Sequence, residues 1–469
     1  IKDTKISKES TKIDSNENEN VLVGKYSFYS MSLIETNLWS RIKEAQKMII
    51  DPNLENLKGT ILMLEWLSVQ NELSQNFKML ALFISLELNL EIGKREGIAS
   101  ISDFNKLQNS ILNLLDNVET GLYDIRAEKK TDLSKEEHYK TLARLVINLD
   151  KEYSACLKLT PTFSPELPIR LSLLGIQFDI FSKMEQLLSL ISEDSSVLRI
   201  RLNILLRNMS MIHYLFDDSV LNSDILSSWL NGKTISSLVE KLYSKILSLN
   251  PSEEILIKAK LYFSFNLSIN NLSTEKALLL LQESTKNSKI CELQVILHNR
   301  ALSALALAYF KKGEFNKTKI QLEGILNDEN LLSLLGQENS EIVEKVTSFP
   351  YFSQINIEEL NFCYLVSAIL TEIYKPRSAV LLKFLESKKN EAFINSRESW
   401  EDRLFACLKS IKKVNISEAV SSMSEIRFMP YSKEFNNKIN SAILVQTLKC
   451  FLVSMIENKS EDIPIEELI

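Results

Sequence analysis

Apolar residues recur at a helical period along most of this chain. In the stretch 297–311, five of them share the i, i+3, i+4, i+7 type of spacing that marks a buried helix face: Leu297, Ala301, Ala304, Leu305 and Ala308. Gly313 follows two lysines, as is typical of a helix C-terminus, and a second periodic run begins at Phe315. The stretch predicts a helical hairpin that resembles one tetratricopeptide-like repeat. An ordinary antiparallel helix pair in any all-helical domain is the alternative.

Periodic segments of this kind cover most of the chain from about residue 30. They predict helices over residues 32–50, 54–74, 77–94, 102–120, 135–158, 166–192, 196–216, 234–249, 252–270, 275–288, 291–311, 315–327, 356–374, 376–390, 398–413, 416–426 and 433–457. Two of these predicted helices have a capping residue followed by a proline at their N-terminus, at Asp51-Pro52 and Asn250-Pro251. The pattern predicts an all-α fold.

Few helix-breaking residues interrupt this pattern. The 469 residues include 10 Gly and 9 Pro, whereas these two types make up about 12% of average proteins. With 45% hydrophobic residues the chain can bury a large core. Weaker copies of the hairpin pattern start at Asn271 and Asn415, at unequal spacings. These features favour a continuous, irregular solenoid of helix pairs over three separate domains.

Two breaks divide the predicted solenoid. Residues 160–168 contain three of the nine prolines, and residues 337–354 lack a clear period. We expect five regions: a disordered polar tail at 1–28, an N-terminal helical region at 29–160, middle helical repeats at 161–290, further helical repeats at 291–457, and a short terminal segment at 458–469.

Composition argues against several classes of protein. A net charge of -6 does not suit a protein whose whole surface binds nucleic acid. Five widely spaced cysteines without a C-x-x-C pair are typical of reduced, intracellular thiols. No apolar run reaches the roughly 18 residues of a membrane span, and no secretory signal opens the chain. We expect a cytoplasmic protein that does not enter membranes, and because it begins at Ile1 we expect its natural N-terminus to be missing.

No residue pattern indicates catalysis or cofactor binding. The three histidines, His138, His213 and His298, lie far apart and have no second ligand at metal-binding spacing. Nucleophile-elbow, zinc-protease and phosphate-loop motifs are absent from the sequence. His213 shares a helix face with apolar residues, which favours a hydrogen-bonded core histidine over a ligand or base. We expect no enzyme activity, no cofactor and no metal.

Three groups of basic residues are candidate contacts with RNA phosphates. They are Arg199 and Arg207 on one helix face, Lys311, Lys312, Lys317 and Lys319 around Gly313, and Lys409, Lys412 and Lys413. Solvated helix faces of a lysine-rich protein have the same appearance, which is the alternative interpretation. Aromatic residues are not interleaved with these groups, so contact by shape and charge fits better than base stacking.

Several sequence blocks resemble one known family. They are Leu297-His-Asn-Arg300, Tyr309-Phe-Lys-Lys-Gly313, Leu334-Leu-Gly-Gln337, Phe349-Pro350-Tyr351, Ile355-Asn-Ile-Glu-Glu-Leu360 and Tyr364-Leu-Val-Ser-Ala-Ile-Leu-Thr-Glu-Ile373. These blocks, in this order, are similar to those of the c subunit of eukaryotic translation initiation factor 3. The close similarity covers residues 297–373, and a fainter one reaches back to the Leu142–Tyr153 block.

The resemblance implies a PCI-type scaffold, in which a right-handed stack of helix pairs is closed by a winged helix. Residues 291–457 would be its PCI-type repeats. The family's members assemble with other subunits of the factor, notably the a subunit, and dock on the RNA and protein of the small ribosomal subunit. They also gather initiation factors 1 and 5 through an N-terminal tail. The resemblance therefore implies a non-catalytic scaffold of translation initiation.

The chain departs from the family pattern at both ends. The family's tail is longer and more acidic than residues 1–20, and Ser460–Ile469 resembles only the first helix of the winged helix. We therefore expect truncation at both ends and a largely missing winged helix. Two other classes stay open: a PCI scaffold subunit of the proteasome lid or signalosome, and a helical-repeat adaptor that binds short peptides in a groove.

Overall fold

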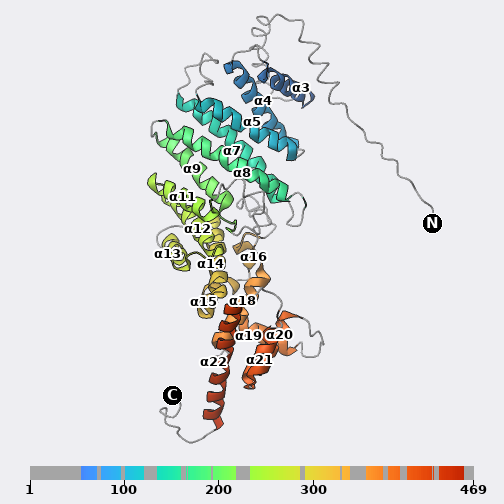
Figure 1. Ribbon diagram of the computed structural model, residues 1–469, viewed down its shortest axis with the longest axis vertical. Coiled ribbons are helices and arrows are strands. Elements are labelled where there is room, and N and C mark those ends of the chain that lie inside the picture. The colour runs from blue at the N-terminus through green and yellow to red at the C-terminus, as the bar shows by residue number, and fades with distance from the viewer. Residues whose placement is uncertain are drawn as a thin grey trace, which may run out of the picture. The chain divides into compact units, whose positions relative to one another are not determined.

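The computed structural model describes residues 54–70, 75–96, 101–120, 135–159, 165, 167–191, 194–217, 233–285, 291–327, 330–337, 355–372, 379–390, 399–424, 426 and 432–458. Within these ranges the regular elements are all helices and no strand occurs (Figure 1). The chain divides into two compact units. Unit 1 comprises Ile1–Ala155 and Ile176–Val197, and unit 2 comprises Cys156–Gly175 and Leu198–Ile469.

Unit 1 contains one largely buried helix that packs between two others. Its helices are α3 (Leu54–Ser68), α4 (Gln75–Glu96), α5 (Ile101–Glu119), most of α7 (Lys135–Leu159) and the second part of α8 (Leu167–Ser189). Both α3 and α5 pack on α4, whose residues 79–86 are all buried. Because a helix segment that is apolar on nearly every side must be covered on most of its surface, α4 is packed between α3 and α5.

Polar contacts fix the helices of unit 1 to one another. The Gln108 amide of α5 donates from Nε2 to Oε1 of Gln177 in α8 over 2.8 Å, and both side chains are buried. Lys183 of α8 forms an ion pair with Asp116 of α5. Since a buried amide is costly without a partner, the Gln108–Gln177 bond specifies how α5 and α8 align.

Unit 2 continues as successive helix pairs. Its helices are α9 (Ser195–Ile212, from Leu198), α11 (Ile235–Ser248), α12 (Glu253–Ile269), α13 (Thr274–Thr285), α14 (Glu292–Lys311), α15 (Phe315–Leu326), α16 (Leu331–Leu334), α18 (Ile357–Glu372), α19 (Ala379–Asn390), α20 (Trp400–Lys412), α21 (Ile416–Ser424) and α22 (Lys433–Asn458). The pairs α12–α13, α14–α15 and α20–α21 are hairpins, α12 packs on α14, and α15 packs on α18. Each hairpin buries its apolar stripe against the next.

The predicted all-α fold of stacked helical hairpins is confirmed. Most observed helix ends lie within about one turn of the predicted ends. The helix predicted at 54–74 ends at Ser68, and α16 was not predicted because its four residues are too few to show a period. The helix predicted at 32–50, the tail at 1–28, residues 338–354 and residues 459–469 lie outside the described residues. The five predicted regions stay predictions.

The turn after α14 brings α22 against the α14–α15 hairpin. Gly313 occupies this turn with a left-handed φ of +73°. Across it, the ring centroid of Phe310 lies 5.2 Å from that of Phe435 in α22, and the ring centroid of Phe315 lies 6.3 Å from it. Lys438 donates from Nζ to the carbonyl of the residue before Gly313 over 3.1 Å. A Cβ at position 313 would lie 2.6 Å from Cδ of Lys438, so glycine permits this close approach.

Replacing Gly313 by alanine should destabilise unit 2. The left-handed backbone costs an L-residue about 1 to 2 kcal/mol, and the added methyl group would also displace the Lys438 side chain. Gly324 is the matched control, because it lies inside α15 and a Cβ added there would have nothing within 4 Å. Gly324→Ala should stabilise the chain by about 0.5 to 1 kcal/mol. Thermal unfolding followed by circular dichroism measures both, and a Gly313→Ala variant as stable as Gly324→Ala would contradict this role.

Candidate interaction surfaces

His213 lies in the core of unit 2 rather than at a reactive site. Its side chain is buried, its Nδ1 lies 2.8 Å from the carbonyl oxygen of Ser210, and its ring centroid is 4.5 Å from that of Tyr262. Asn266 of α12 donates from Nδ2 to the His213 carbonyl over 3.0 Å. Burial lowers the pKa of His213 from 6.5 to about 3, which the hydrogen bond to Ser210 only partly offsets. The predicted hydrogen-bonded core histidine is confirmed.

The polar residues at the end of the Leu297–Arg300 block hold α14 against α16. Asn299 donates from Nδ2 to the Leu334 carbonyl, and Arg300 donates from a terminal guanidinium nitrogen to the Leu335 carbonyl, each over 3.3 Å. Arg300 is 2% exposed, and burial lowers the pKa of its guanidinium from 12.5 to about 9. Because an unpaired buried cation is costly, the hydrogen bond of Arg300 to the Leu335 carbonyl favours this alignment of α14 with α16.

The next two blocks continue the same connection to α18. Gln337 donates from Nε2 to the Ile355 carbonyl over 2.9 Å. Asn356 then accepts at Oδ1 from the backbone amides of Glu358 and Glu359, over 2.9 and 3.3 Å, and so caps α18. Three of the sequence blocks therefore form one polar connection from α14 through α16 to α18. Their residues position helices, which the sequence pattern alone did not reveal.

Of the two arginines in the first basic group, one is exposed and the other is partly buried. Arg199 of α9 is exposed. Arg207 is partly buried and donates to the Ser210 hydroxyl over 3.1 Å. It also lies close enough to His213 and Tyr214 to influence their titration. Of this pair, Arg199 is the better placed to meet a phosphate.

The second basic group does not form a single face. Lys311 and Lys317 are exposed, although Lys317 pairs with Glu314 over 2.5 Å. Lys312 is partly buried and donates to the Thr274 hydroxyl over 3.1 Å. Two residues on one helix that are two positions apart point about 200° apart, so Lys317 and Lys319 face opposite ways.

Lys319 belongs to the interior. It is 8% exposed and forms an ion pair with Glu372 of α18. An ammonium that is desolvated and paired with a carboxylate would have to break that pair to bind a phosphate. Lys319 therefore holds α15 to α18, and we do not include it among the candidate RNA contacts.

The third basic group lies at the C-terminal end of α20. Lys409, Lys412 and Lys413 are all exposed, and the Lys409 ammonium lies 4.4 Å from the centroid of the Phe405 ring. Positive charge is favourable at this end of a helix. Burial raises the pKa of the Cys450 thiol in α22, and the positive charge of Lys412 partly offsets this rise. Lys412 therefore lies near Cys450. The group is thus adjacent to α22.

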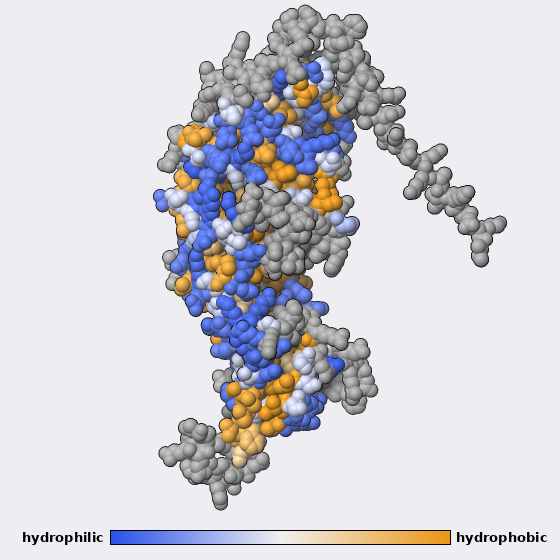
Figure 2. Space-filling view, in the orientation of Figure 1, coloured by the Kyte–Doolittle hydropathy of each residue, from blue (hydrophilic) through white to orange (hydrophobic). Residues whose placement is uncertain are grey.

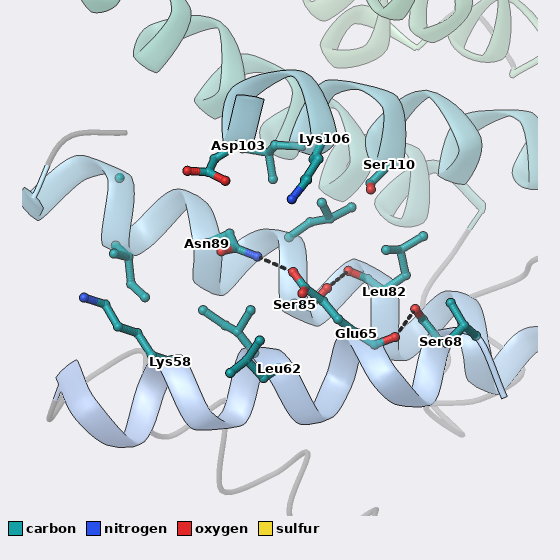
Figure 3. Close-up of a pocket in the computed structure, with 16 residues that line it drawn as sticks. Lys58, Leu62, Glu65, Ser68, Leu82, Ser85, Asn89, Asp103, Lys106 and Ser110 are labelled. Atoms are coloured by element: carbon teal, nitrogen blue, oxygen red, sulfur yellow. Dashed lines mark hydrogen bonds between the residues drawn. The ribbon is translucent and has the colours of Figure 1, made fainter. Parts of the chain in front are cut away.

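A groove in unit 1 is a further candidate surface that the sequence did not indicate. It has a volume of about 700 Å³ and lies between α3, α4 and α5 (Figure 3). Leu82 and Ser85 of α4 lie at its base, and Leu62 of α3 lies exposed on its wall. Asn89 donates from Nδ2 to Oε1 of Glu65 across it over 3.2 Å. The groove depends on the spacing of three helices, which no local residue pattern encodes.

Metal-binding clusters and membrane spans were sought over the described ranges. There, no group of three or more His, Cys, Asp or Glu side chains gathers closely enough to hold a metal ion. Of the helices within those same ranges, none combines the length and apolar character needed to cross a bilayer.

Comparison with known proteins gives a consistent similarity. Residues 109–380 match the family model described as the N-terminus of eukaryotic translation initiation factor 3 subunit 8. Three relatives are each named as the C subunit of eukaryotic translation initiation factor 3. The one from Lodderomyces elongisporus is 23% identical over 395 residues, which cover 78% of this chain and 50% of the relative.

The two other relatives match shorter stretches. The protein from Anopheles gambiae is 26% identical over 295 residues, which cover 57% of this chain and 30% of the relative. The protein from Candida albicans is 27% identical over 198 residues, which cover 39% of this chain and 22% of the relative. The matched part of the chain thus spans half or less of the length of these relatives.

Acidification should destabilise unit 2 through His213. The imidazole stays neutral in the folded chain down to about pH 3, whereas the unfolded chain protonates it near pH 6.5. The unfolded state therefore binds more protons between these values, and stability is lost as the pH falls. The loss should reach about 2 kcal/mol between pH 6.5 and pH 5. In the His213→Gln variant residue 213 cannot titrate, so the melting temperature should change less with pH across that range. An unchanged pH profile would contradict this assignment.

Proposed function

Because this chain belongs to the family of the C subunit of eukaryotic translation initiation factor 3, we propose that it is a non-catalytic scaffold subunit of that factor, acting in the cytoplasm. In this role it assembles with other subunits, notably the a subunit, and docks on the small ribosomal subunit during initiation. Binding of initiation factors 1 and 5 would fall to the N-terminal tail, whose residues lie outside the described part of the chain.

One observation carries the proposal. The polar residues of the sequence blocks that resemble the family join α14, α16 and α18 instead of lining a reactive cavity. Charged and amide groups are costly to bury, and here they serve to align helices. A chain built in this way offers fixed surfaces to partners, which is how a helical-repeat scaffold works.

Docking on ribosomal RNA would rest on the exposed basic residues. These are Arg199, Lys311, Lys317, Lys409, Lys412 and Lys413. Lysine and arginine bind RNA by displacing condensed counterions, so affinity falls as salt rises. Contact through a few such side chains is compatible with a chain of net charge -6, because the rest of the surface need not touch RNA.

The peptide-binding adaptor stays a second candidate because of the groove between α3, α4 and α5. Grooves between helices bind short segments through apolar anchors and a few polar contacts. The two functions differ in scale: an adaptor binds one peptide tightly by itself, whereas an initiation scaffold binds large partners in a salt-dependent manner. Assembly with proteasome-lid or signalosome subunits would instead indicate the other PCI scaffolds.

The full chain, together with its partner subunits, should co-sediment with small ribosomal subunits at low salt. Lys311→Gln combined with Lys317→Gln should lower the salt dependence of binding, reducing the slope of log K against log salt by about 2, because two phosphate contacts are lost. Sucrose-gradient sedimentation at several salt concentrations measures this.

Lys241→Gln combined with Lys383→Gln provides a matched control. Both lysines are exposed, in α11 and α19, and the double substitution changes the net charge equally. Its salt slope should equal that of the unaltered chain. Failure of the unaltered chain to sediment with ribosomes at low salt would contradict the proposed function. Equal slopes for the two double variants would remove the α14–α15 turn from the RNA contacts.

A further inference from the structure

A carboxylate holds the ammonium group of Lys317 at the α14–α15 turn. Glu314 lies three residues before Lys317 and pairs with it over 2.5 Å. The Nζ of Lys317 also lies 5.1 Å from the centroid of the Tyr309 ring. The Glu314 side chain makes no capping hydrogen bond at the start of α15, so its carboxylate is not needed to begin that helix. Its contact with Lys317 is therefore open to another explanation.

A second carboxylate, that of Glu359 in α18, lies near the ammonium group of Lys311. Lys311 is the last residue of α14 and follows Phe310, whose ring centroid lies 6.1 Å from that of Phe362 in α18. Glu359 lies three residues before Phe362 on the same helix. Burial raises the pKa of the Glu359 carboxyl, and the positive charge of Lys311 partly offsets this rise. The helix contact and the charge effect thus agree.

The third basic group has no such carboxylates. Lys409, Lys412 and Lys413 are exposed at the end of α20, and within the described ranges none of them forms an ion pair. Carboxylates beside lysines are thus not a general feature of the basic groups of this chain. Because a carboxylate and a phosphate compete for the same ammonium group, Lys311 and Lys317 are less available to RNA than their exposure suggests.

We propose that Glu314 and Glu359 restrain RNA binding at the turn, so that Lys311 and Lys317 bind only where adjacent phosphates displace both carboxylates. A lone anion gains little by replacing a carboxylate already in place, whereas neighbouring phosphates on one RNA make several contacts at once. The surface over α14 and α15 is largely hydrophilic (Figure 2), which suits contact with a solvated polyanion. The proposal rests on the scaffold function proposed above and adds a limit on its RNA contact.

A purely structural role for the two carboxylates makes a different prediction. If Glu314 and Glu359 only stabilised the turn, replacing them would lower the melting temperature and leave RNA binding unchanged or weaker. If they compete with phosphate, replacing them should tighten RNA binding, because the lysines then no longer have to release a carboxylate. The direction of the change in affinity therefore separates the two roles.

Binding of a labelled double-stranded RNA hairpin to the full chain tests the proposal. The turn variant combines Glu314→Gln with Glu359→Gln. Fluorescence anisotropy at low salt should show that it binds the hairpin about fivefold more tightly than the unaltered chain, because two carboxylates no longer compete with phosphate. The gain should shrink as salt rises. Circular dichroism checks that the turn variant keeps its fold.

Two controls separate local competition from a change in net charge. The control variant, Glu240→Gln combined with Glu283→Gln, loses the same charge from carboxylates that pair with Lys276 and Lys260, which are not candidate RNA contacts. It should alter hairpin binding by no more than about twofold. In a chain that already carries Lys317→Gln, adding Glu314→Gln should give no further tightening, because the ammonium group they compete for is gone.

Two results would overturn the proposal. One is a turn variant that binds the hairpin no more tightly than the control variant does, which includes no binding by either. The other is a gain from Glu314→Gln that is as large without Lys317 as with it. Hairpin binding is measured without ribosomes. A turn variant that gains affinity for the hairpin in a chain that never sediments with ribosomes would refute the scaffold function alone. Sedimentation with ribosomes, combined with equal hairpin binding by the turn and control variants, would refute the present proposal alone.

Discussion

The contact of three phenylalanine rings at the Gly313 turn is the interaction on which the arrangement of unit 2 depends most. Phe310 and Phe315 come from the two helices of one hairpin, and Phe435 comes from α22, more than a hundred residues later. Aromatic rings bury large areas and prefer tilted geometries, so this contact fixes both the position and the direction of α22. The left-handed glycine is what allows the backbone of the turn to come so close.

Polar side chains complete what the apolar stripes begin. Apolar packing alone leaves neighbouring helices free to slide, because it has little direction. Arg300 and Gln337 restrict that freedom between α14, α16 and α18 through hydrogen bonds to backbone carbonyls. The exposed lysines near the α14–α15 turn are thereby carried on helices whose alignment is fixed. Fixed surfaces are what a member of this initiation factor 3 family needs in order to serve as a scaffold.

Much of the fold could be predicted from the sequence because helix formation leaves a local signal. The stripe from Leu297 to Ala308 and the Lys-Lys-Gly element at residues 311–313 encode the α14–α15 hairpin within a short window. The exposure of individual surface residues left a weaker signal in the sequence. Lys317 and Lys319 looked equivalent in the sequence, yet one is exposed and the other is buried against Glu372. The groove of unit 1 and the polar connection from Arg300 to Leu335 depend on contacts between distant segments, which no local pattern contains.

Hydrogen exchange of the Phe435→Ala variant, compared with the unaltered chain, tests most directly whether the aromatic contact holds α22 to the hairpin stack. Removing the ring opens a cavity between the turn and α22. Deuterium uptake should therefore rise together in residues 433–458 and in residues 309–322, while α3 and α5 in unit 1 keep their protection. Faster exchange confined to α22, with the α14–α15 turn as protected as before, would contradict the account.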